Sequence, residues 1–117
     1  MSEPPLDESA LLQLVDGDRA FLRTLVETFR ADCRASMDAL RTAVAAEDPD
    51  AIEQAAHQLK GAAGNLRAGP TREAARRLER MGAEGNLAEV ADALAVLERE
   101  VDRLDAALRE LTARDAS

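Results

Sequence analysis

The chain has 117 residues and a formal net charge of −8, with two phenylalanines and neither tyrosine nor tryptophan. This acidic balance argues against a nucleic-acid-binding protein, and no apolar run approaches the roughly 18 residues that would cross a membrane. A core almost without aromatics must be filled by leucine, alanine and valine, which favours packed helices over a sheet. We therefore predict an all-α protein.

Capping residues and helix breakers divide the chain into a short tail and five helices. Residues 1–6, which contain two prolines, are expected to form a flexible tail, and residues 7–117 a single domain. The predicted helices run from the cap Asp7 to Val15, from Arg19 to Ala46, from Pro49 to Leu66, from Thr71 to Ala83 and from Leu87 to Arg114. The predicted breaks are Asp16-Gly17, Glu47-Asp48, Gly69-Pro70 and Gly85-Asn86.

The apolar residues of the long helices follow the spacing of helix bundles. The last helix has a seam spaced 4, 3, 4, 3, 4 and 3, formed by Val90, Leu94, Leu97, Val101, Leu104, Leu108 and Leu111. Four such helices with short joins predict an antiparallel four-helix bundle, with the short first helix covering one end. The last seam could instead drive self-association, but closing the bundle requires the same seam, so we predict a monomer.

A single cysteine cannot form an internal disulfide, and Cys33 falls on the apolar seam of the first long helix. We therefore predict that it is a buried thiol. The N-terminus lacks the basic region and the apolar stretch of a signal peptide. These features lead us to expect a cytoplasmic protein.

His57, the only histidine, is followed by Lys60, Gly61 and Gly64, which a helix places on one surface strip. The core seam of the same helix is expected to consist of Ile52, Ala56, Leu59, Ala63 and Leu66. Since His57 lies at the edge of this seam, we expect its imidazole to be reachable from water. The two glycines cost roughly 2 kcal/mol relative to alanine, which suggests that something approaches the backbone closely there.

Several other catalytic arrangements lack the residues they need. The glycines do not form a phosphate-binding loop, and one histidine cannot supply the paired Glu-x-x-His motifs of a di-metal bundle site. No strained nucleophile turn accompanies the serines. What remains is an accessible imidazole beside a cation, which can attack phosphorus and form a phosphohistidine. We expect no metal or other cofactor on this chain.

The run from Ala56 to Gly64, AHQLKGAAG, resembles the motif of histidine-containing phosphotransfer (HPt) domains of two-component phosphorelays. The resemblance covers nearly the whole chain and includes Gly17-Asp18 before Phe21-Leu22, Glu47-Asp48 before the motif and Leu78-Glu79 after it. It implies that His57 carries a phosphoryl group and that the chain has no kinase activity of its own. The implied partners are response-regulator receiver domains, which would bring the Mg²⁺, and a hybrid histidine kinase.

The resemblance also bears on two residues outside the motif. Glu79, 22 residues after His57, falls where family members commonly place a glutamine or glutamate that bonds the imidazole. Arg67 stands where the family usually has glycine, directly after Leu66. It either ends the helix in a different way or adds a cation to the surface on which partners dock.

Gly61, Gly64, Arg67 and Arg76 are the candidate docking residues. Arg76 belongs to a basic stripe with Arg72, Arg77 and Arg80. Two interpretations of this stripe stay open: a solvated face whose charges pair along the helix, or a contact surface for an acidic partner.

Phe21 and Leu25 lie beside the seam of the first long helix. They either form an apolar docking patch or pack under the short first helix. For the protein as a whole, the competing hypothesis is a helical adaptor that binds signalling partners without phosphotransfer.

Overall fold

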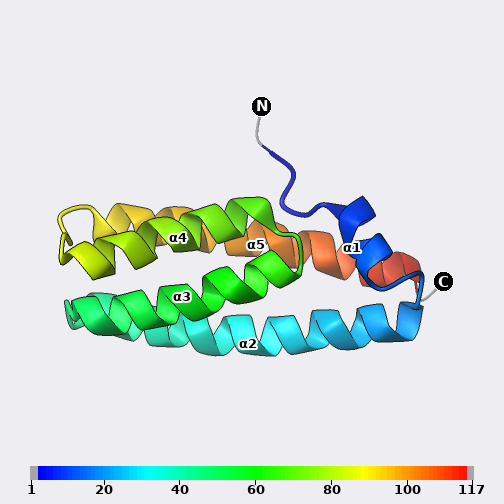
Figure 1. Cartoon of the computed structure of the whole chain (residues 1–117), viewed down its shortest axis with the longest axis horizontal. Coiled ribbons are helices and arrows are strands. Elements are labelled where there is room, and N and C mark those ends of the chain that lie inside the picture. The colour runs from blue at the N-terminus through cyan, green and yellow to red at the C-terminus, as the bar shows by residue number, and fades with distance from the viewer. Residues whose placement is uncertain (1–2, 116–117) are drawn as a thin grey trace.

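The structure, a computed structural model, describes residues 3–115 as five helices. They are α1 (Glu8–Leu14), α2 (Arg19–Ala45), α3 (Pro49–Asn65), α4 (Gly69–Glu84) and α5 (Val90–Asp115). Helices α2 to α5 run alternately up and down, each packs on the next, and α5 closes back on α2 in a bundle 46 Å long (Figure 1). Helix α1 covers the end where α2 begins. The predicted four-helix bundle with an additional short helix is confirmed.

Three aspartates begin the first three helices. Asp7, Asp18 and Asp48 each accept a hydrogen bond from the backbone N–H three residues on, at 3.0, 2.9 and 3.2 Å. These bonds satisfy N–H groups that the first turn of a helix leaves without a partner. The starts of α2 and α3 therefore lie where the sequence predicts them, and Pro49 occupies the first turn of α3.

Helix α3 ends at a residue in the left-handed conformation, and this residue is Arg67, with φ +60°. Its N–H donates to the Gly64 carbonyl at 3.1 Å, and the Ala68 N–H donates to the Ala63 carbonyl at 2.9 Å. This pair of bonds is the Schellman motif, whose left-handed position favours glycine because a Cβ is strained there. Arg67 therefore ends the helix in the ordinary way, at a cost that glycine would not have.

Two predicted boundaries are wrong. Helix α4 begins at Gly69 rather than at Thr71, because Arg67 makes the break and a proline is tolerated in the first turn of a helix. Helix α5 begins at Val90 rather than at Leu87, since the chain first makes a turn in which the Val90 N–H donates to the Leu87 carbonyl at 3.2 Å.

The core is a single cluster of aliphatic side chains with Cys33, Met37 and one aromatic, Phe29. The predicted seam of α3 is buried in full. Cys33 is 5% exposed, as predicted, and burial raises the pKa of its thiol to about 11. None of the helices in the described part of the chain is long and apolar enough to span a membrane.

The segment before α1 lies against the bundle over its described residues. Leu6 is buried, the Asp7 N–H donates to the Arg67 carbonyl at 3.1 Å, and Arg103 donates to the Glu3 carbonyl at 2.8 Å. The first two residues of the expected tail lie outside the described residues.

Leu25 and Phe21 differ in their surroundings. Leu25 packs against the core, whereas Phe21, near the start of α2, is 50% exposed. Half of the Phe21 side chain is therefore accessible to a partner.

Candidate functional site

His57 lies midway along α3, on the surface of the bundle. Burial of Ile52, Ala56, Leu59 and Ala63 fixes the rotation of the helix, and His57 follows the buried Ala56 by one residue. Its side chain is 67% exposed. The imidazole is therefore accessible to another macromolecule.

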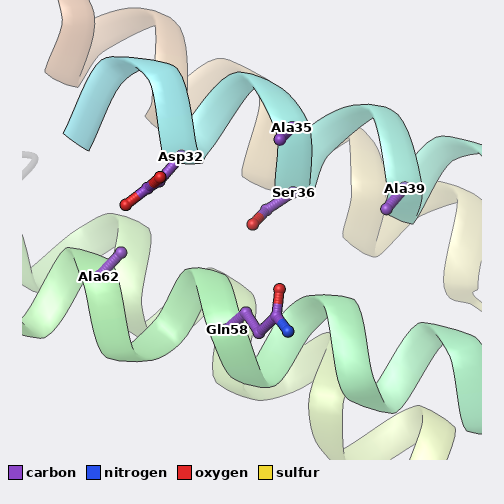
Figure 2. A pocket seen from close by; sticks show the side chains of 6 residues that line it. All are labelled: Asp32, Ala35, Ser36, Ala39, Gln58 and Ala62. Carbon is purple, nitrogen blue, oxygen red and sulfur yellow. The ribbon is translucent and has the colours of Figure 1, made fainter. Parts of the chain in front are cut away.

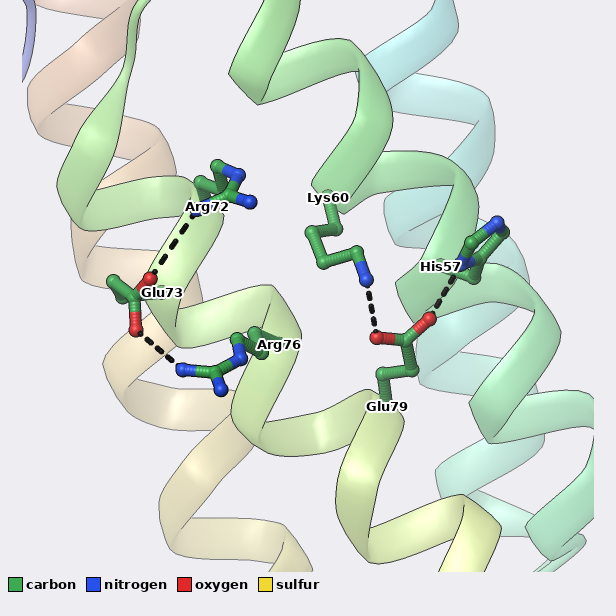
Figure 3. Close-up of polar contacts among 6 residues, drawn as sticks. All are labelled: His57, Lys60, Arg72, Glu73, Arg76 and Glu79. Atoms are coloured by element: carbon green, nitrogen blue, oxygen red, sulfur yellow. Dashed lines mark hydrogen bonds and ion pairs between the residues drawn. The ribbon is translucent and has the colours of Figure 1, made fainter.

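Glu79 of α4 points toward α3 and lies between His57 and Lys60 (Figure 3). One carboxylate oxygen, Oε2, contacts Nδ1 of His57, and the other, Oε1, accepts a hydrogen bond from Lys60 Nζ at 2.7 Å. The Glu79 and Lys60 side chains are only 19% and 25% exposed. The structure thus brings together the three residues proposed for catalysis, with the carboxylate more sheltered than the imidazole.

The charge on Glu79 determines the tautomer of His57. The hydrogen bond from Lys60 lowers the pKa of the Glu79 carboxyl, burial opposes this, and the contact with His57 lowers the pKa further. An ionised carboxylate can only accept hydrogen bonds, so Nδ1 of His57 must be the donor. In the neutral imidazole the lone pair is then on Nε2, the ring nitrogen that Glu79 leaves unoccupied.

The two glycines of the motif have different surroundings. No heavy atom of the described residues outside the helix lies within 4 Å of a Cβ built on Gly61, which is exposed. A Cβ on Gly64 would instead contact the Arg72 side chain at 3.4 Å. Open backbone is therefore found at Gly61, whereas Gly64 is partly covered by α4.

The arginines among the candidate docking residues have partners within the chain. Arg76 lies 3.4 Å from the Glu73 carboxylate, three residues before it, and Arg72 lies 3.5 Å from the same residue. The Arg67 guanidinium returns to the Gly64 carbonyl at 3.4 Å. These side chains are exposed, so their pairs are weak and exchangeable.

A groove between α2 and α3, which the sequence analysis did not identify, lies beside the histidine strip. Its volume is about 450 Å³, and its lining residues are Asp32, Ala35, Ser36, Ala39, Gln58 and Ala62 (Figure 2). The sequence does contain a trace of it, since these small and polar residues recur every three or four positions on α2. Gln58 places the groove directly beside His57.

Comparison with known proteins identifies the family. The Hpt domain family matches residues 24–107. The chain belongs to this family. An Hpt structure, that of histidine-containing phosphotransfer protein B from Pseudomonas aeruginosa PAO1, is 26% identical, with a TM-score of 0.89 over 97% of this chain and 98% of that chain. A search of curated proteins found no match. The chain is thus a histidine phosphotransfer intermediate of a phosphorelay.

The Hpt site has no grouping suited to a metal. Among the described residues, no cluster of three or more His, Cys, Asp and Glu side chains could hold a metal ion. The carboxylate nearest His57 is already engaged by Lys60.

Proposed function

We propose that His57 is the residue that carries the phosphoryl group and that it exchanges this group with the aspartates of receiver domains. The observation that carries the proposal is the contact of Glu79 with Nδ1 of an imidazole that is 67% exposed. A carboxylate in this position orients the ring and directs the reactive lone pair outward. Such an arrangement suits a nucleophile whose substrate arrives on another protein.

The transfer exchanges one phosphorus bond for another. Nε2 of His57 attacks the phosphorus of a receiver aspartyl phosphate, the N–P bond forms, and the P–O bond to the aspartate breaks and releases its carboxylate. The positive charge that develops on the imidazole is stabilised by the Glu79 carboxylate bound to Nδ1. Passing the group to a second receiver reverses these steps.

Lys60 acts through Glu79 in the resting protein. Its ammonium group holds Oε1 of Glu79 at 2.7 Å, which leaves Oε2 directed at His57. Because Lys60 lies on the same strip of α3 as His57, its charge also favours the approach of a phosphoryl group. We propose that it orients the carboxylate first and supports the phosphoryl group second.

The receiver domain is proposed to dock over the face that α2 and α3 share. The α2/α3 groove lies on one side of His57, and open backbone at Gly61 lies one turn further along α3. Arg67 and Arg76 supply exposed cations at the border with α4, which suits the clustered carboxylates of a receiver site. The receiver would bring its Mg²⁺ to this face, and one such receiver would belong to a hybrid histidine kinase.

The chain is proposed to act as a monomer in the cytoplasm. The seam of α5 that could have driven self-association is directed inward, with Leu97, Leu104 and Leu108 fully buried. Sedimentation at micromolar concentration is expected to give the mass of one chain, and cell fractionation would test the location.

Incubation with a phosphorylated receiver domain tests the proposed function. Label that is labile to acid and stable to alkali should appear on the wild-type chain and be absent from His57→Gln. Because an exposed imidazole contributes little to packing, this variant should keep its helical circular dichroism and melting temperature. Glu110→Gln, exposed on α5, is the matched control and should label normally. Acid-labile label on His57→Gln would refute the assignment, and an unlabelled wild type with every cognate receiver would favour the adaptor.

A further inference from the structure

Helices α3 and α4 come unusually close at Gly82, a glycine buried within α4. A Cβ built there would lie 2.7 Å from both the Glu53 backbone nitrogen and the Pro49 carbonyl oxygen, and 3.0 Å from the Glu53 Cα. Of the six glycines, all within the described residues, Gly82 is the one at which a Cβ would meet backbone this closely. Backbone inside a helix cannot rotate aside as a flexible side chain can, so any larger residue must push the helices apart.

This close approach is adjacent to the candidate catalytic site. Gly82 lies three residues after Glu79 on α4, and Glu53 lies four residues before His57 on α3. Since the two helices are antiparallel, the backbone contact lies about one helical turn, or roughly 5 Å, from the contact between Glu79 and His57. The separation of the helices at Gly82 therefore determines how far the Glu79 side chain must reach.

The consequence of an added methyl group follows from the contact distances. A contact of 2.7 Å must open to at least the 3.4 Å of ordinary van der Waals contact, so the helices must separate by about 0.7 Å at this point. The bond from Lys60 to Glu79 is 2.7 Å long, and a comparable increase would take it to the limit of a useful hydrogen bond. The contact of Glu79 with His57 would be loosened in the same way.

We propose that Gly82 is a positioning residue for phosphotransfer, because it sets the separation of α3 and α4 at which Glu79 reaches both His57 Nδ1 and Lys60. The inference rests on the proposed function for its effect on the transfer rate. The geometric part of it concerns the contact alone and can be measured without any partner.

The test compares Gly82→Ala with Ala83→Gly by nitrogen-15 NMR of the imidazole. In the wild type, the Nδ1 hydrogen should be held by Glu79 and give a downfield proton resonance. In Gly82→Ala this resonance should move upfield or broaden, the fraction of the tautomer with hydrogen on Nδ1 should fall, and the pKa of Glu79 should rise toward its ordinary value as the Lys60 bond weakens. Ala83→Gly changes the adjacent exposed residue and destabilises the same helix without approaching α3, so it should keep the wild-type resonances.

Transfer from a phosphorylated receiver supplies the second readout. Gly82→Ala should slow the transfer about tenfold, as expected for a small misplacement of catalytic groups, whereas Ala83→Gly should transfer normally. If Gly82→Ala destabilises the fold, the spectra of both variants can be recorded in trimethylamine N-oxide, which favours the folded state, so that folded proteins are still compared.

A folded Gly82→Ala with unchanged imidazole resonances and an unchanged Glu79 pKa would overturn the proposal. If the resonances move but no variant, including the wild type, is ever labelled, the proposed function fails, whereas the geometric part of the inference, that Gly82 sets the contacts of Glu79, stands.

Discussion

Replacing Gly61 by glutamine should stabilise the protein while slowing phosphotransfer. A side chain at this position enters open space, since no heavy atom of the described residues outside the helix lies within 4 Å of its Cβ. Exchanging glycine for a good helix former in a helix interior contributes about 0.5 to 1 kcal/mol. In a domain of this size, that gain corresponds to a rise of about 2 to 4 °C in the melting temperature. The same side chain would stand where a receiver domain has to approach His57.

Both effects can be measured on one preparation, by thermal unfolding followed by circular dichroism and by transfer from a phosphorylated receiver. Gly61→Ala should give the same stabilisation with a smaller loss of rate, because a methyl group blocks less of the surface. Ala91→Gln, an exposed substitution on α5, controls for an added glutamine away from the site. Normal transfer by Gly61→Gln would show that partners do not use the open backbone, and a lower melting temperature would refute the steric argument.

Substitutions at three further positions test the remaining parts of the structure. Glu79→Gln should slow transfer only mildly because the amide oxygen can still accept a hydrogen bond from Nδ1. Glu79→Ala should lower the transfer rate about 10- to 100-fold, which corresponds to the loss of a hydrogen bond to a charged group. Equal transfer rates for the two variants would contradict the orienting role of Glu79. Lys60→Ala should slow transfer and shorten the phosphohistidine lifetime with little change in partner affinity. In the double variant with Glu79→Ala, it should lower the transfer rate only slightly further, because Lys60 acts through Glu79. Fully additive losses of rate would indicate that Lys60 acts independently of Glu79. Arg67→Gly should raise the free energy of unfolding by about 1 kcal/mol because it removes the strain of a Cβ in the left-handed conformation. If urea titration shows no increase in this free energy, the contacts of the arginine side chain compensate the strain.

The sequence predicted those features that are determined within a single helix. Aspartate caps located the starts of α2 and α3, and the apolar spacing of α3 predicted that His57 would be exposed beside Lys60. The contact of Glu79 with the imidazole was predicted by the family resemblance, and it fits the position of Glu79 directly after the buried Leu78 on α4.

Features that depend on the distance between helices could not be predicted in this way. Gly61, Gly64 and Gly82 look alike in the sequence, since each interrupts an otherwise helical pattern. The structure distinguishes them by their neighbours: open space for the first, the Arg72 side chain for the second and the backbone of α3 for the third. The start of α4 was misplaced for a related reason, because the residue that adopts the left-handed conformation between α3 and α4 is Arg67 rather than the glycine two positions later.

The geometry of this site therefore depends on two kinds of spacing: that of residues along α3, which the sequence determines directly, and that between α3 and α4, which depends on how the helices pack. Spacing along α3 puts His57, Lys60 and Gly61 on one strip, and any helix with this motif would do the same. Only the packing of α4 on α3 supplies the carboxylate that holds Nδ1 and leaves Nε2 available for the proposed attack. A histidine this exposed has few other contacts to fix its ring, so its orientation depends mainly on that one neighbour. The motif alone specifies an accessible imidazole, and the bundle adds the carboxylate that orients it for the role of nucleophile proposed above.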